Sequence, residues 1–180
     1  MAHFTAAAVC QEGFADCCTT VGNVDITTLE GVVILRCIKR FAPAIQKDLN
    51  KKLKQNRKTK KESKFARCAF LLPNNSCRIY AVRPFSCRCL YSLQKCGENG
   101  PMIHRQAWQA AETMRSALRQ LDDTGYTGHM GYIMQLLNDA RFSRTYLSGA
   151  FAPQEIQEFA MAHGITINRF SRTMRNANPS

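Results

Sequence analysis

Residues 68–89 read Cys68-Ala-Phe-Leu-Leu-Pro-Asn-Asn-Ser-Cys77-Arg-Ile-Tyr-Ala-Val-Arg-Pro-Phe-Ser-Cys87-Arg-Cys89, the most cysteine-dense stretch of the chain. A second group, Cys10, Cys17 and Cys18, lies near the start, and no cysteine follows Cys96. A soft metal takes about four thiolate ligands, which one short segment rarely supplies in good geometry. The distribution therefore predicts that two separated groups of cysteines converge on one metal centre.

The cysteine count also bears on the compartment. Nine cysteines in 180 residues is an odd number, so complete pairing in intramolecular disulfides is impossible. The first ten residues lack the basic segment and long apolar run of an export signal. No stretch approaches the roughly 18 apolar residues of a membrane helix. We therefore expect a cytoplasmic protein with no membrane span, in which clustered cysteines bind metal or are redox-active.

Three short motifs in this region carry a family resemblance. They are Cys68-Ala-Phe-Leu, Cys77-Arg-Ile-Tyr and Arg83-Pro-Phe-Ser-Cys87-Arg, and they follow the early cysteine group in a fixed order. Over roughly residues 10–90 the chain resembles the bacterial cysteine-cluster family (YkgJ-type), described as a zinc- or iron-chelating domain. Two positions depart from the family pattern, since Phe14 stands where the family has a cysteine and Ala69 where it has a proline. The resemblance implies these metal ligands: Cys10, Cys17, Cys18, Cys68, Cys77 and Cys87.

The ligand missing at Phe14 could be replaced by Cys89. In an extended segment Cys87 and Cys89 would point to the same face, because side chains alternate along a strand. Cys89 is therefore included in the predicted ligand set. Cys96 could be a further ligand or a free exposed thiol, whereas Cys37 falls within a helical pattern and is expected in the core.

The cysteine number leaves the metal open between zinc and an iron–sulfur cluster. One structural zinc takes four ligands. Six or seven cysteines fit a four-thiolate cluster with spare cysteines, or two metals that share ligands. A flagellin lysine methylase related to the family is associated with an iron–sulfur centre, which slightly favours the cluster. Arg78, Arg83 and Arg88 could offset the thiolate charge, or they could form a solvated basic face.

The predicted fold class is mainly α, with a small irregular metal-stapled cysteine-rich half packed on a helical C-terminal half. The first half spans residues 1–100 and the second residues 101–180, within one continuous domain. A capping box at Thr27-Thr28-Leu29-Glu30 predicts a helix that starts near Thr28. Pro43 predicts a second helix that runs to about Gln55.

For the rest of the chain the sequence predicts only the approximate positions of the elements. Residues 65–96 are expected to form short strands and turns, and residues 101–180 helices without strands. Helices are expected from Pro101, from about Gly131 to Phe142, and from Pro153 to a stop at Gly164. Trp108 is expected in the core, and Asp122-Asp123 is expected to end a helix. The histidines, which are expected to be surface or cap residues, are His3, His104, His129 and His163.

The net charge is +12, from 25 Lys+Arg against 13 Asp+Glu. Residues 51–64 hold eight of the cations and one acid, Glu62. This segment is expected to be a helix end that passes into an exposed basic loop. It could contact nucleic-acid phosphates or an acidic protein partner. Base stacking is not supported, because aromatic residues are not interleaved with the charges.

No catalytic motif is present in the sequence. It lacks a Walker loop, a dinucleotide glycine fingerprint, Gly-x-Ser-x-Gly and His-Glu-x-x-His. The expected function is therefore that of a cysteine-cluster metal-binding protein, with zinc or an iron–sulfur cluster, in a non-enzymatic, redox or accessory role. The alternative is a basic accessory subunit or nucleic-acid-binding protein in which the metal is purely structural.

Overall fold

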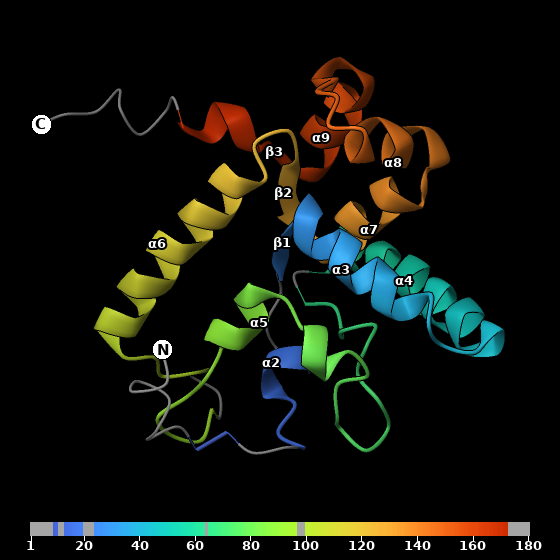
Figure 1. The fold of residues 1–180 in the computed structure, drawn as a ribbon. Coiled ribbons are helices and arrows are strands. Elements are labelled where there is room, and N and C mark those ends of the chain that lie inside the picture. Colours follow the sequence, from blue (N-terminus) through green and yellow to red (C-terminus); the bar gives the residue numbers. More distant parts are fainter. Residues whose placement is uncertain (1–8, 11–12, 20–23, 64, 97–99, 173–180) are drawn as a thin grey trace, which may run out of the picture.

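The computed structural model describes residues 9–10, 13–19, 24–63, 65–96 and 100–172. It is mainly helical, as predicted, with one small sheet (Figure 1). The α-helices are α2 (Asp16–Thr19), α3 (Thr28–Ile38), α4 (Pro43–Glu62), α5 (Phe85–Cys89), α6 (Arg105–Leu121), α7 (Met130–Asn138), α8 (Ala140–Leu147) and α9 (Gln157–His163). The other elements are the strands β1 (Asp25–Thr27), β2 (Tyr126–His129) and β3 (Thr166–Ile167), and the 3-10 helices η1 (Tyr80–Val82), η2 (Pro153–Ile156) and η3 (Asn168–Arg172).

The sheet joins segments that are far apart in the sequence. Its strand order is β1-β2-β3 and both pairs are antiparallel, with Ile26 opposite Gly128 and Tyr126 opposite Ile167. The prediction that residues 101–180 contain no strand is therefore wrong. Strands of four and two residues are too short to show a two-residue hydrophobic period, and long-range pairing forms them.

Helix α3 begins where the sequence predicts. The Thr27 hydroxyl oxygen accepts a hydrogen bond from the Glu30 amide at 3.2 Å, and the Glu30 carboxylate accepts one from the Thr27 amide at 2.9 Å. This reciprocal capping box satisfies two amides that the helix leaves unpaired. The helix packs closely on α7, since a Cβ added at Gly31 would lie 2.6 Å from the Leu137 Cδ1 atom.

Helix α4 is longer than predicted, and the expected basic loop over residues 51–64 is wrong. The helix continues to Glu62, so nearly all of that segment is helical; Lys64 lies outside the described residues. Lysine, arginine and glutamine are good helix formers, and no glycine or proline interrupts the segment. Leu49 and Leu53 are buried. The Asn56 side chain donates to the Arg67 carbonyl at 2.7 Å and ties the helix to the segment that follows it.

The core lies between α3, α4, α7 and the sheet. Its most buried large side chains include Ile34 of α3, Leu53 of α4, Ile133 and Met134 of α7, and Phe70 of the cysteine-rich segment. The cysteine-rich segment is thus anchored in the main core. It contains η1, α5 and one isolated bridge between residues 71 and 77, where the sequence predicted short strands and turns.

Three predictions for the second half need correction. The single helix expected up to Phe142 is two helices, because the Asp139 carboxylate accepts from the Phe142 amide at 2.8 Å and caps α8. The helix expected from Pro101 begins at Arg105. Trp108 is 48% exposed and does not belong to the core. By contrast, Gly164 ends α9 in a left-handed conformation (φ 62°), as predicted.

Asp122 does more than end α6. It is 4% exposed, and burial raises the pKa of its carboxyl, whereas the bonds from Tyr146 and from backbone amides oppose that rise. Its Oδ2 atom accepts from the Leu29 amide at 3.1 Å and from the Asn168 side chain at 3.3 Å. Its Oδ1 atom accepts from the Tyr146 hydroxyl at 2.6 Å. One buried carboxylate therefore links α3, α8 and η3 to the end of α6.

Two histidines are helix caps, as predicted. The Nδ1 atom of His104 accepts from the Gln106 amide, and that of His129 accepts from the Gly131 amide, both at 3.2 Å. His163 stacks on Tyr132, with ring centroids 4.1 Å apart. His3 lies outside the described residues.

Lowering the pH from 7 to 5 should destabilise the fold by about 2 kcal/mol through His129. Burial, helped by the charge of Lys60, lowers the pKa of His129 to about 4, against roughly 6.5 in the unfolded chain. The neutral imidazole therefore stabilises the fold above pH 6.5, and this stabilisation is lost as the pH falls towards 4. Urea unfolding at several pH values measures the loss. His129→Asn keeps an acceptor for Gly131 and should flatten the dependence; an unchanged slope would contradict the assignment.

Candidate metal centre

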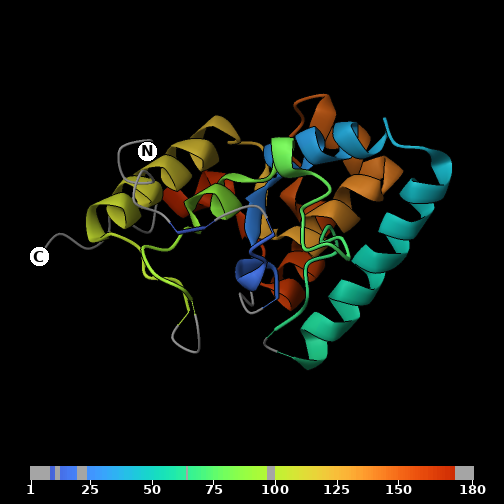
Figure 2. The same ribbon diagram turned by 90° about the horizontal axis from the view of Figure 1, so that it is seen from below.

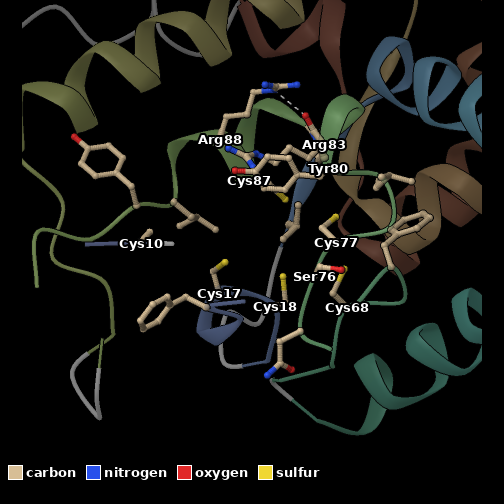
Figure 3. A pocket seen from close by; sticks show the side chains of 18 of the residues that line it. Cys10, Cys17, Cys18, Cys68, Ser76, Cys77, Tyr80, Arg83, Cys87 and Arg88 are labelled. Carbon is tan, nitrogen blue, oxygen red and sulfur yellow. Dashed lines mark hydrogen bonds between the residues drawn. The ribbon is translucent and has the colours of Figure 1, made fainter. Parts of the chain in front are cut away.

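Six of the seven predicted ligands line one cavity. The cavity has a volume of about 350 Å³, and Figure 3 shows sulfur atoms from different segments turned towards it. Its apolar walls include Phe14, Phe70 and Ile79. Convergence of the two cysteine groups is thus a feature of the fold. The six cysteines are Cys10, Cys17, Cys18, Cys68, Cys77 and Cys87.

Backbone contacts bring these segments together. The Cys68 amide donates to the Cys18 carbonyl at 2.8 Å and joins the early cysteine group directly to the later one. The isolated bridge between Leu71 and Cys77 and the bond from the Arg78 amide to the Phe70 carbonyl, 2.9 Å, turn the chain back so that Cys77 lies near Cys68. The cysteines are therefore positioned by main-chain bonds that need no metal.

Helix α5, which carries Cys87, is held by the capping box of α3. The second carboxylate oxygen of Glu30 accepts from the Phe85 amide at 2.7 Å, and the Ser86 hydroxyl donates to the Asp25 carbonyl at 2.7 Å. Glu30 thus caps one helix and fixes the start of another, 55 residues further on. The sequence indicated only the first of these roles.

Cys89 does not line the cavity. Residues 85–89 are helical, and side chains two positions apart on a helix point about 200° apart. The extended geometry predicted for Cys87 and Cys89 is therefore wrong. Cys89 is 4% exposed and faces α6, where burial raises its pKa and the charge of Arg115 opposes the rise.

Cys96 lies in an adjoining cavity of about 300 Å³. Cys10, Asp16 and Cys17 line this second cavity as well, so the two cavities meet at Cys10 and Cys17. Cys96 is partly buried and is not the exposed thiol that was one of its two predicted states. Cys37 is partly buried and packs against the hydrophobic core, away from both cavities.

The thiols of the cavity interact with one another. Cys17, Cys18 and Cys68 are hydrogen-bonded in series. The bond to Cys18 and burial raise the pKa of Cys17 far above its usual range. In Cys18 the bond from Cys17 lowers the pKa, but the bond to Cys68 and burial outweigh it and raise the pKa to about 11. Without metal the thiols of Cys17 and Cys18 are therefore neutral at pH 7. Within the described ranges, no three His, Cys, Asp or Glu side chains are grouped to hold a metal ion in this conformation.

Arg83 is the basic residue that faces the sulfurs. Burial raises the pKa of Cys77 and of Cys87, and the charge of Arg83 opposes the rise in both. Its guanidinium lies 3.8 Å from the Tyr80 ring centroid, and its buried Nε atom has no hydrogen-bond partner among the described residues. The guanidinium of Arg88 instead donates to main-chain carbonyls, that of Ala81 at 2.8 Å among them, and so braces the loop.

Two further groups near the sulfurs are polar. Tyr91 lines the same cavity, and its buried hydroxyl lacks a partner within the described part of the chain. The Ser92 amide donates to the Cys10 sulfur at 3.2 Å. Amide and guanidinium donors of this kind stabilise thiolates and tune the metals that thiolates hold. The sequence did not indicate Glu30 and Ser92 as site residues, because each reaches the site through a hydrogen bond to a residue distant in sequence. Tyr91 was missed as well, since no motif marks it.

Comparison with protein-family models, with curated proteins and with solved structures found no match. The resemblance to the YkgJ-type family therefore stays a prediction that rests on the motifs. None of the helices in the described part of the chain has both the length and the apolar composition that a bilayer span requires.

Proposed function

We propose that this chain is a cysteine-cluster metal-binding protein whose cavity holds an iron–sulfur cluster or zinc. One observation carries the proposal: six cysteines from segments up to 77 residues apart line a single cavity. Thiols that serve only as small apolar core residues pack against their neighbours and do not gather around open space. The proposed ligands come from Cys10, Cys17, Cys18, Cys68, Cys77 and Cys87, and Cys89 is left out.

The residues around the cavity fit a negatively charged metal–thiolate group. Deprotonated sulfurs would carry negative charge, and Arg83 lies beside them with a buried donor that lacks a partner in the described structure. The Ser92 amide already donates to one sulfur. Metal binding has to displace the protons of the hydrogen-bonded thiols, so affinity should rise with pH. Small side-chain rotations of Cys17, Cys18 and Cys68 would exchange sulfur–sulfur hydrogen bonds for bonds to metal.

An iron–sulfur cluster is favoured over a single zinc. One tetrahedral zinc uses four ligands, and the cavity offers six cysteines and about 350 Å³ of space. A polynuclear centre uses such space and can carry an electron, which a zinc ion does not. We propose a redox or accessory role in the reducing cytoplasm, with no catalysis by the chain itself.

Anaerobic purification, followed by elemental analysis and visible absorption, tests the proposal. Iron and sulfide together with broad visible absorption would support the cluster. Zinc in stoichiometric amount without that absorption would assign zinc. If neither metal is present, and reconstitution with either fails to load the chain, the proposed function is wrong.

A further inference from the structure

Five lysines of α4 form a single ridge. They are Lys47, Lys51, Lys54, Lys58 and Lys61, spaced by alternating steps of four and three residues. At 100° per residue this spacing keeps all five within an arc of about 80°. All five are exposed, and the buried Leu49 and Leu53 lie on the opposite face. We call this set the lysine ridge.

The ridge is rigid. Helix α4 lies along one edge of the molecule (Figure 2) and packs on α7. The Arg57 guanidinium reaches the Gly131 carbonyl at 3.5 Å, and Asn56 bonds to the Arg67 carbonyl at 2.7 Å. The 14 residue steps from Lys47 to Lys61 correspond to about 21 Å of helix, or one cation for roughly every 5 Å.

The charge of the ridge is not neutralised within the described chain. Asp48 forms an ion pair with Lys52 at 2.9 Å, but Lys52 lies to the side of the ridge. None of the five ridge lysines forms an ion pair with a carboxylate of the described residues. A rigid row of unpaired cations is complementary to a polymer with regularly spaced negative charges.

Nucleic acid matches this surface better than a membrane or a protein does. Membrane-surface helices need an exposed apolar face, and here Leu49 and Leu53 are buried in the core. Protein interfaces favour arginine and are depleted of lysine, whereas lysine binds phosphate as a point charge. The ridge carries no aromatic side chain for base stacking. We propose that the lysine ridge of α4 binds the phosphate backbone of a nucleic acid without reading its sequence. This inference does not depend on the metal centre.

Fluorescence anisotropy with a labelled duplex of ~20 base pairs, in DNA and RNA form, tests the ridge between about 50 and 200 mM salt. Five phosphate contacts predict a slope of log K against log salt of about −4.5. The triple variant K51Q/K54Q/K58Q leaves two contacts, so the slope should flatten from about −4.5 to about −2. At the low-salt end, binding should weaken by about tenfold or more. Glutamine keeps helix propensity, so unfolding should not change. The arginine triple K51R/K54R/K58R should retain binding.

The matched control removes the same charge elsewhere. Lys39, Lys95 and Arg105 are exposed and lie outside α4, so K39Q/K95Q/R105Q lowers the net charge equally. Binding by this control should stay close to that of the parent. Equal loss in both triples would show that net charge alone drives binding and would overturn the proposal. So would the absence of duplex binding at low salt, or ridge-dependent binding of polyglutamate without binding of either duplex.

Discussion

Replacing Cys87 by alanine is expected to lower the loading of the metal centre, whereas the same change at Cys89 should leave loading intact. Both residues lie on α5, two positions apart, but only Cys87 lines the cysteine cavity. Metal per chain after anaerobic reconstitution measures the difference. Because metal binding and folding are coupled, the rise in melting temperature on adding metal should also be smaller in Cys87→Ala.

Cys89→Ala is a stringent control for packing. Cys89 is 4% exposed, so its replacement also removes a buried sulfur atom. A packing effect alone would therefore appear in both variants. Unchanged loading of Cys87→Ala would show that the centre does not use this ligand. The opposite result, in which Cys89→Ala loses metal and Cys87→Ala keeps it, would contradict the prediction. It would mean that Cys89 is a ligand although its side chain does not line the cavity.

Asp122→Ala is expected to lower the free energy of unfolding by about 3–5 kcal/mol. The variant leaves two donors without their acceptor, the Leu29 amide and the Tyr146 hydroxyl. The Asn168 side chain loses its 3.3 Å bond to the carboxylate but keeps its 2.8 Å bond to the main-chain carbonyl of residue 122. Each buried donor without a partner costs about 1–3 kcal/mol. Urea denaturation at pH 7 measures the change.

The neighbouring residue offers the control. Asp123 is half-exposed, and its ion pair with Arg169, 2.7 Å, is at the surface. Asp123→Ala should therefore cost less than about 1 kcal/mol. Tyr146→Phe removes one donor from the network and should fall between the two. Similar losses for Asp122→Ala and Asp123→Ala would mean that the buried carboxylate is not the link between α3, α8 and η3.

Local signals in the sequence were reliable guides to the fold. The capping box at Thr27 and Glu30 marks the start of α3, and Gly164 marks the end of α9. These signals depend on hydrogen bonds and backbone preferences within a few residues, so they act in the same way in many folds. The grouping of the cysteines also predicted that the two separated groups come together, and cysteines of both groups line one cavity. It did not identify the individual residues, because Cys89 belonged to the predicted set and lies outside the cavity.

Predictions that depended on distant contacts were less successful. Residues 126–129 become a strand only because β1 and β3 pair with them. The basic end of α4 stays helical up to Glu62, where the sequence predicted a loop. There the Asn56 side chain bonds to the Arg67 carbonyl, beyond the end of the helix. Trp108 lies on α6, whose buried residues are the small Ala107 and Ala111. The tryptophan itself is half-exposed, so the large apolar side chain was a poor guide to burial.

By itself, the sequence determined the inventory of thiols and charges, their spacing, and where several helices begin and end. The tertiary structure alone decided which sulfurs share a cavity and that Cys89 turns away from it. The physical reason is that the direction of a side chain follows the backbone conformation of its segment. At Cys87 that conformation is helical, and the bond from the Phe85 amide to Glu30 fixes it from 55 residues away.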